Sequence, residues 1–543
     1  MTDPQLPVSV FSWILALLPL AILLILLVVL RWTAPQAGSL GMFVAAAVAV
    51  LAFQVPWDTL AVSAAKGVWD AIFILYVIWP ALLLYQVTDR AGGYDSLRRA
   101  ITRFSRNELF IVIALGWVFS SFLQGVAGFG APIAIVAPLL VAYGVKPVYA
   151  VVIPLIAHIW AKLFGTLAAG WLATLQVVTL EDPTAAAVEG ALLLIIPTVA
   201  GGFTVAFMYG RWEAVKHAWP LVLIISALQG GGQLVLMYVD PVLSAFLAAA
   251  AALVALFPLS RWPRYNEPAE GISERPAMDD QREDEQFEGE PIMGMGMSFL
   301  PYILLSVIAI AALAVEPIQQ ALEQFSVGMP FPAVTTGYGV ETAAADPYSP
   351  FAPLTHPGTI LLVTSIITLL VYRARGYYQE WKERGETEEG GILFGLVSDA
   401  VPSSMPIVAF LVMAKIMDHS GMNIVLALGI AAVAPPLVFA FLSSTIGAIG
   451  AFMTSSSTSS NVLFSPLQQG VAELNDLPES TIIGAQSAGG AIGNAVAPAN
   501  VVMGATTAGI RGKEGEILRK TIPWTVVTTI ITGLATVLLV VLR

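Results

Sequence analysis

Eight small polar residues interrupt a long apolar part of the sequence. The run Thr454-Ser455-Ser456-Ser457-Thr458-Ser459-Ser460-Asn461 lies between Ala451-Phe452-Met453 and Val462-Leu463-Phe464. Lipid cannot satisfy hydroxyl, amide and backbone groups, so such a segment survives at membrane depth only where protein buries it or where it lines a wet cavity. These residue types therefore indicate a binding site for a polar solute, and the rest of the chain must position that site.

A lysine and a histidine lie one helical turn apart in a second apolar stretch. Lys162 is in the middle of the segment Pro154 to Trp171, four positions after His158. A lone lysine at the centre of a membrane helix costs roughly 2.5–3.5 kcal/mol on insertion scales, so something should offset its charge. The functional interpretation is a counter-charge for a carboxylate, and the alternative is a lysine paired or snorkelling for structural reasons. His158 would face the same ligand and relay a proton, or would be an ordinary buried histidine.

The composition places these residues in a membrane protein. Of the 543 residues 57% are hydrophobic and 11% are charged, and the mean hydropathy is +0.80, whereas a soluble protein carries about 25% charged residues. The first apolar run, 11–30, follows an acidic leader without a basic start or a cleavage site, so we expect it to be a retained span. The formal charge of −12 speaks against a nucleic-acid partner.

Several classes of chemistry are excluded by what the sequence lacks. The chain has no cysteine, which rules out disulfides, thiol catalysis and cysteine metal sites. Its four histidines form no His-Glu-x-x-His motif, which argues against a zinc enzyme, and no Walker loop is present, so ATP is not the expected energy source. The sequence therefore predicts no metal, no cofactor and no enzymatic activity.

Apolar runs predict about twelve transmembrane helices, each needing about 17–25 residues. The expected spans are 11–30, 39–54, 62–87, 148–177, 190–209, 219–238, 241–258, 298–315, 358–373, 391–417, 480–509 and 521–542. Arginine and lysine mark the cytoplasmic connections, and the connection 316–357 contains neither. We therefore expect a multi-pass protein of the plasma (inner) membrane with both termini outside.

Two stretches do not fit as simple crossings. By the positions of the charged residues, 108–143 leaves the cytoplasmic side and returns to it, whereas 433–470 leaves the outer side and returns there. Each is expected to be a re-entrant hairpin with its tip in mid-membrane. The first tip is Gly125-Val126-Ala127-Gly128-Phe129-Gly130-Ala131-Pro132, and the second is the hydroxyl run.

The two hairpins belong to stretches that resemble each other. Asp70 and Asp399 differ by 329 positions, as do Gly92 and Gly421. Because the copies have opposite expected orientations, we interpret them as inverted repeats, the architecture of secondary transporters. The expected domains are 1–210 (first repeat), 211–297 (a linking helix pair and an acidic cytoplasmic linker) and 298–543 (second repeat). The predicted fold is thus all-α, with two inverted repeats that each contain a hairpin.

Glycine and proline interrupt the helix that follows each hairpin. The first, Pro154 to Trp171, contains Gly165 and Thr166; the second, Ile482 to Ala505, contains three candidate polar ligands, Gln486, Ser487 and Asn494. Breaks of this kind expose backbone groups and helix ends to a ligand.

The motifs at these positions resemble those of the L-lactate permease family. Gln124 to Ile135, reading QGVAGFGAPIAI, is similar to its "EGAAGFGAPVAI", and Thr454 to Phe464, reading TSSSTSSNVLF, is similar to its "TGSDTSSNALF". Gly489-Gly490, Gly493 and Pro498 resemble its "GGxxGKxxxPQ". The resemblance implies import of a small monocarboxylate such as L-lactate or glycolate with protons. By analogy it also implies an elevator-type fold and a homodimer.

This sequence departs from the family pattern at four informative positions. Gln124 replaces a glutamate, Ser457 an aspartate and Asn494 a lysine, whereas Lys162 supplies a cation where the family commonly has none. Two acids able to carry a coupling proton are therefore replaced, while the requirements of an anion site are kept. Sodium remains the alternative coupling ion, since hydroxyl-rich hairpins suit it, and another small organic anion remains an alternative substrate.

The candidate site follows from these motifs. The substrate-binding residues are expected to be Gln124, Gly128, Phe129, Gly130, His158, Lys162, Ser456, Ser457, Thr458, Ser459, Ser460, Asn461, Gln486, Ser487 and Asn494. Glycines at the first tip would allow a tight turn and close approach of backbone to ligand. The alternatives are that the hydroxyls cap a helix and that Gln124 braces the hairpin.

Intramembrane carboxylates supply the remaining candidates. Lys66 and Asp70 are four residues apart and are expected to neutralise each other. With His158, Asp70 and Asp399 are candidates for ion coupling because they occupy equivalent places in the two repeats. A different function would use these two aspartates as the dyad of an intramembrane protease, although neither lies in a Gly-x-Gly-Asp motif. A third possibility is an anion channel.

Overall fold

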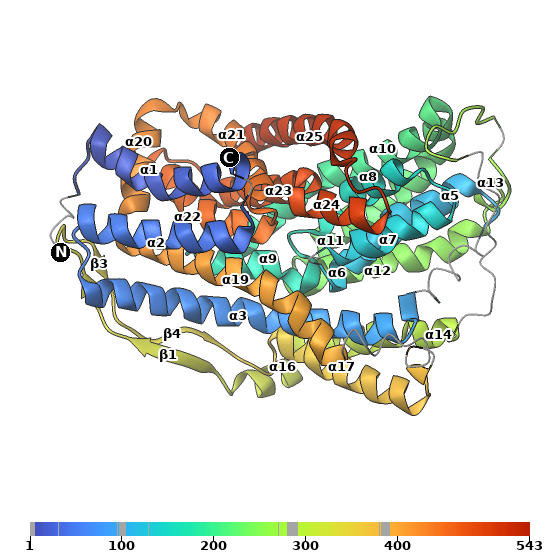
Figure 1. Ribbon diagram of the computed structural model, residues 1–543, viewed down its shortest axis with the longest axis horizontal. Helices are drawn as coiled ribbons and strands as arrows, with labels where there is room; N and C mark the ends of the chain where they lie inside the picture. The colour runs from blue at the N-terminus through green and yellow to red at the C-terminus, as the bar shows by residue number, and fades with distance from the viewer. Residues whose placement is uncertain are drawn as a thin grey trace.

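Two long helices, α3 (Trp57–Arg90) and α19 (Ile392–His419), pack against each other along the length of the molecule (Figure 1). They run antiparallel, since Trp79 Nε1 of α3 donates to Ser404 Oγ of α19 at 3.0 Å and residues on either side pair in reverse order. The computed structural model describes residues 6–30, 32–94, 96, 105–128, 130–269, 271–279, 292–379, 381 and 391–543.

A helix–turn–helix follows each of these long helices and occupies the range predicted for a hairpin. The first consists of α5 (Glu108–Ile113), η2 (Ala114–Phe119), α6 (Ser120–Val126) and α7 (Ala131–Ala142). The second consists of α21 (Pro436–Thr454) and α22 (Ser457–Leu474). In Figure 1 the first lies in the right half of the molecule and the second in the left half. A short helix not expected from the sequence, α20 (Met422–Val433), precedes the second hairpin.

Each hairpin is followed by a helix that breaks in its middle and then by a long helix. The first broken helix comprises α8 (Pro147–Ala157), η3 (Ile159–Ala161) and α9 (Gly165–Leu175) and precedes α10 (Pro183–Ser226); the second comprises α23 (Glu479–Gly493), η6 (Asn494–Val496) and α24 (Pro498–Thr507) and precedes α25 (Glu514–Leu542). The same order of elements therefore occurs twice in the chain. The expected breaks are present and lie within buried segments.

Reciprocal contacts relate the two copies. Lys415 pairs with Asp70 at 3.2 Å, and the residues 329 positions away, Gln86 and Asp399, form a hydrogen bond of 2.6 Å. A second reciprocal set, with an offset of 331, consists of Ser480 with Glu189 and of Lys520 with Tyr149, each pair at 3.1 Å. In both sets residue i of one copy contacts residue j of the other, and the residue equivalent to j contacts the residue equivalent to i.

The other helices complete the bundle. They are α1 (Val10–Leu24), η1 (Ile25–Val29), α2 (Ala34–Ala52), η4 (Ala227–Gly231), α11 (Gly232–Leu236), α12 (Pro241–Ser260), α13 (Pro263–Asn266), α14 (Met295–Ser298), α15 (Leu300–Leu313), α16 (Glu316–Glu323) and α17 (Pro357–Ala374). In the described part of the chain, ten helices are long and apolar enough to cross a membrane, or eleven if the bent pair α15–α16 is one span. The expected count of about twelve differs because the broken helices divide into shorter pieces and because 190–209 and 219–238 belong to the continuous but kinked α10 and its extension.

The connection between α16 and α17 forms strands, so the all-α expectation is wrong there. Strand β1 (Val327–Phe331) pairs antiparallel with β4 (Ala345–Phe351), and β2 (Val334–Thr335) pairs with β3 (Glu341–Thr342). The longer strands lie beside α3 (Figure 1), and Tyr348 of β4 donates a hydrogen bond to the Asp70 carboxylate at 3.0 Å. This loop covers one end of the α3–α19 pair.

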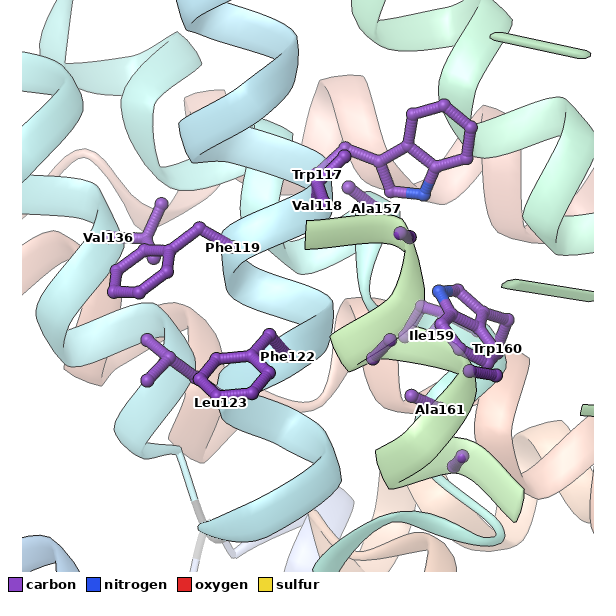
Figure 2. Close-up of a cluster of buried hydrophobic side chains, with 14 of the residues drawn as sticks. Trp117, Val118, Phe119, Phe122, Leu123, Val136, Ala157, Ile159, Trp160 and Ala161 are labelled. Carbon is purple, nitrogen blue, oxygen red and sulfur yellow. The ribbon is translucent and has the colours of Figure 1, made fainter. Parts of the chain in front are cut away.

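Apolar packing holds the first hairpin against the first broken helix. Trp117 of η2 and Trp160 of η3 are almost completely buried and lie on the same side of the hairpin helix, whereas Phe122 of α6 points to its other side (Figure 2). Trp160 Nε1 donates to Ser121 Oγ at 2.9 Å, which satisfies its polar edge. The break at residues 158–164 is therefore held in place by the hairpin beside it.

Candidate functional site

The first hairpin tip contacts the first broken helix through Thr166. The Thr166 hydroxyl accepts a hydrogen bond of 2.9 Å from the Gly128 backbone N–H. The Gln124 side chain is close to a glycine of the tip and to a glycine of the break. A Cβ added to Gly128 would be 3.0 Å from Gln124 Nε2, and a Cβ added to Gly165 would be 3.3 Å from the same atom. Gln124 therefore lies between the tip and the break, and its Oε1 has no hydrogen-bond partner in the described part of the chain.

The backbone around Thr166 is strained. Thr166, Leu167 and Ala168 have φ values of 52°, 49° and 61°, three consecutive left-handed residues without a glycine. Each such residue costs on the order of 1–3 kcal/mol and persists only where the surrounding structure enforces it. Strain of this kind clusters at binding sites and switches, which marks residues 166–168 as part of the site.

We expect Thr166→Val to lower the free energy of unfolding by about 1–3 kcal/mol, because it leaves the buried Gly128 amide without an acceptor. Thr166→Ser keeps the hydroxyl and should retain most of the stability. Unfolding midpoints of the two variants, measured in detergent, test this. Equal midpoints for the two variants would show that the hydroxyl does not hold the tip.

The second tip contacts both broken helices. Asn494 Nδ2 donates to the Ser455 carbonyl at 3.4 Å, and the Ala499 N–H donates to Ser455 Oγ at 3.2 Å. On the other side Asn461 Nδ2 donates to Thr174 Oγ1 of α9 at 3.0 Å. Ser455, in the left-handed region with φ 56°, makes the turn between α21 and α22. The hydroxyl run is thus held between the two breaks.

Part of the hydroxyl run has a structural role. Ser456 caps α22 by accepting the Ser459 N–H, and Ser460 Oγ donates to the Gly447 carbonyl at 2.8 Å. Gln486 of α23 donates to Ser460 Oγ at 3.2 Å and accepts from Gln468. The helix-capping alternative is therefore correct for Ser456, and a capped helix start also presents backbone amides to an anion.

Lys162 lies where the first break meets the second hairpin. A Cβ built on Gly170 would be 3.5 Å from the Lys162 carbonyl oxygen and 3.6 Å from Thr458 Oγ1, so the lysine backbone and this hydroxyl adjoin the same glycine. Lys162 is 8% exposed, and no carboxylate of the described residues pairs with it. His158 is fully buried, and neither of its ring nitrogens has a partner there. A lysine buried in this way is either neutral or paired with an anion, so the site can hold an anion beside a charged Lys162.

The two tips are also linked through Asn494, an expected site residue, and Asn500, which the sequence analysis did not single out. Asn500 Nδ2 donates to Asn494 Oδ1 at 2.7 Å, and Asn500 Oδ1 lies 3.9 Å from a Cβ built on Gly130 of the first tip. Gly130 has φ +90°, a conformation that L side chains rarely adopt. Asn500 was identifiable as a polar residue after Pro498 in the broken helix. Thr166 and Thr174 are the other missed contacts.

The structure thus brings together the first tip, the second tip and both breaks. Ser487 is buried with its hydroxyl unpartnered in the described part of the chain. Ser457 and Thr458 are almost completely buried in the first turn of α22. Phe129 lies outside the described residues.

The coupling candidates Asp70 and Asp399 are not neighbours. Asp70 pairs with Lys415, not with Lys66 as expected, and Lys66 Nζ instead lies 4.9 Å from the Tyr348 ring centroid. Asp399 accepts from Gln86, which is on the same helix as Asp70 but more than four turns away, roughly 24 Å at 1.5 Å per residue. A protease dyad needs two carboxylates in contact, so the aspartyl protease hypothesis is wrong.

Comparison with known proteins identifies the family. A family model described as L-lactate permease matches residues 12–543. The chain belongs to that family. This membership makes it a multi-pass membrane transporter, not an enzyme.

Relatives of the L-lactate permease family align along nearly the whole chain. The glycolate permease GlcA of Escherichia coli (strain K12) is 27% identical, covering 97% of this chain and 95% of its own. The L-lactate permease of Halalkalibacterium halodurans is 27% identical, covering 96% and 95%, and that of Bacillus subtilis is 24% identical, covering 94% and 92%. A solved structure, the YdaH transporter of Alcanivorax borkumensis, aligns at 15% identity with a TM-score of 0.40, covering 85% and 84%.

Proposed function

We propose that this protein is a secondary active transporter that imports a small monocarboxylate such as L-lactate or glycolate together with protons. The observation that supports this most is Lys162, a buried lysine without a carboxylate partner among the described residues, whose backbone carbonyl adjoins the same glycine, Gly170, as the Thr458 hydroxyl at the capped start of α22. A monocarboxylate supplies the missing negative charge. The names of the relatives, which are lactate and glycolate permeases, favour the same substrate class.

In this proposal the substrate carboxylate binds between Lys162 and the amides at the start of α22. The other expected ligands line this substrate site or support it. They are Gln124, Gly128, Gly130, Ser456, Ser457, Thr458, Ser459, Ser460, Asn461, Gln486, Ser487 and Asn494. A substrate hydroxyl would bond to the hydroxyl run or to Asn494. His158 would carry the coupling proton, because both of its ring nitrogens are buried without a partner in the described part of the chain. Asp70 and Asp399 are weaker coupling candidates, since each has a polar partner.

The reciprocal contacts support two inverted repeats. Copies with opposite orientations in the bilayer would be related by a two-fold axis in the membrane plane, and reciprocal pairs are what such an axis produces. We propose that each hairpin enters the membrane from its own side, that both termini are outside, and that the protein resides in the inner membrane. The proposed movement is of the elevator type, in a homodimer.

Transport in proteoliposomes tests the function. Protein reconstituted with unlabelled lactate inside should take up labelled lactate by counterflow, and glycolate should compete. An imposed inward proton gradient should then drive accumulation above the external concentration at constant sodium. Accumulation driven by sodium alone would establish the alternative coupling ion. Flux that never exceeds the electrochemical gradient would identify a channel.

A further inference from the structure

Lys415 joins three parts of the molecule at one point. Its ammonium group, on α19, lies 3.2 Å from the Asp70 carboxylate of α3 and 5.6 Å from the centroid of the Tyr348 ring. It also donates a hydrogen bond of 2.6 Å to the carbonyl of Gln176, the residue directly after α9. A cation at a helix C-terminus meets the negative end of the helix dipole. Lys415 therefore ties the α3–α19 pair to the helix whose Gly170 and Thr174 meet the second tip.

The second repeat offers no equivalent tie. The counterpart of Lys415 is Gln86, and the counterpart of Gln176, 331 positions on, is Thr507 at the end of α24. Gln86 does not reach α24; its amide donates to Asp399, and its Oε1 accepts from Arg90 Nε at 3.0 Å. Thr507 Oγ1 donates to carbonyls of its own helix. At one end of the α3–α19 pair, therefore, Lys415 bonds to the end of α9, whereas at the other end Gln86 bonds to Asp399 and Arg90 of the pair itself.

Helix packing shows the same asymmetry. Helix α9 packs against α3, and α22 packs against α19. In the other copy the corresponding pairs are α24 with α19 and α7 with α3. Within the described ranges neither of these pairs is packed as closely as α9 with α3 or α22 with α19. Two inverted repeats that exchange conformations produce the oppositely facing state of a transporter. On the proposed function the structure is one of two such states, and the contact from Lys415 to Gln176 belongs to this one.

We propose that Lys415 is a positioning residue for transport. It holds α9 in this state and releases α9 when the substrate site moves. In the other state Gln86 then approaches the C-terminal end of α24 near Thr507. The inference rests on the proposed transport function. In the released state Lys415 keeps Asp70 as its counter-ion, so breaking the contact to Gln176 leaves no carboxylate buried alone. The contact to the α9 carbonyl is the part that opens.

Cross-linking tests this directly, because the chain contains no cysteine. One double variant carries Lys415→Cys with Gln176→Cys, and a second carries Gln86→Cys with Thr507→Cys. A bis-methanethiosulfonate reagent replaces the length of the lysine side chain, since a direct disulfide needs Cα atoms within about 7 Å. The matched control is Trp79→Cys with Ser404→Cys, which joins α3 to α19 only.

Both test pairs should link, and each link should lower lactate counterflow by about tenfold or more relative to the same variant unlinked, with recovery after reduction, because a locked transporter cannot complete its cycle. Linking of the control pair should leave the rate within about twofold. Full linking between positions 415 and 176 without loss of counterflow would overturn the proposal, as would failure of positions 86 and 507 to link.

A charge-balanced variant separates positioning from mere stability. Lys415→Met with Asp70→Asn removes both ions, so it avoids a lone buried charge. If Lys415 favours the present state, the double substitution should raise the yield of the cross-link between positions 86 and 507 severalfold. Lys415→Arg keeps the charge and should not raise it. An unchanged yield in the double variant contradicts the proposal. Yields are read from the thiols left free on the protein and need no substrate. If the protein does not transport a monocarboxylate but both cysteine pairs still link, the proposed function is wrong, whereas the proposed positioning role of Lys415 stands.

Discussion

Lys162→Ala is expected to weaken the uptake of lactate severely. Truncating one partner of a buried, hydrogen-bonded charge pair costs about 2–5 kcal/mol, which corresponds to a fall in kcat/KM of roughly 30-fold to more than 1,000-fold. The loss should appear mainly as a higher KM, because the substrate carboxylate loses its counter-charge before any movement begins. Uptake kinetics in proteoliposomes, with the amount of folded protein measured by size-exclusion chromatography, provide the test.

Two further variants interpret the result. Lys162→Arg keeps the charge with a different shape and should retain a measurable fraction of the rate, since the guanidinium also pairs with carboxylates. Lys146→Ala removes an exposed lysine side chain that donates to the carbonyl of Pro276, a residue far along the chain from the candidate site, and should transport normally. If Lys162→Ala transported with near-normal kinetics, the lysine would have a structural role and the carboxylate site would lie elsewhere.

The sequence predicted the hairpins and the breaks because their polar residues are costly in lipid. A run such as residues 454–461 has no reason to interrupt an apolar stretch unless protein or ligand satisfies it. The same reasoning located Lys162 and the glycine-rich tip at residues 125–132. At these positions the local composition and the overall fold both require polar residues to be buried in protein, so the sequence was enough to locate the hairpins and the breaks.

The partners of the charged residues could not be predicted in this way. The spacing of Lys66 and Asp70 fits a pair within one helix, but Asp70 found Lys415 across the helix interface. An exposed helix leaves such i, i+4 pairs as neighbours, whereas a buried helix offers each carboxylate several competing partners from other elements. The strands at 327–351 were missed for a similar reason, since short, proline-containing strands are stabilised by the α3 surface they cover.

Gly489→Ala is expected to prevent stable folding. A Cβ at Gly489 would overlap the backbone carbonyl of Ser444, so α23 and α21 could no longer approach as closely as they do. Membrane helices rely on small residues for this approach, because lipid provides no hydrophobic force that drives helices together. A backbone atom cannot move aside as a flexible side chain can, so we expect a loss of about 3 kcal/mol or more, at the upper end of overpacking costs.

The consequences of this substitution extend to the site because α23 bears Gln486 and leads into Asn494. Separation of α23 from α21 would break the Gln486 contact to Ser460 and the Asn494 contact to Ser455 together, so binding and stability should fail jointly. Thermal unfolding in detergent measures the effect. Gly231→Ala is the matched control: a Cβ there meets no atom within 4 Å, and alanine is the better helix former by about 1 kcal/mol. The unfolding midpoint of Gly231→Ala should be unchanged or higher. If Gly489→Ala unfolded at the same temperature as Gly231→Ala, α23 and α21 would be able to separate without a loss of stability.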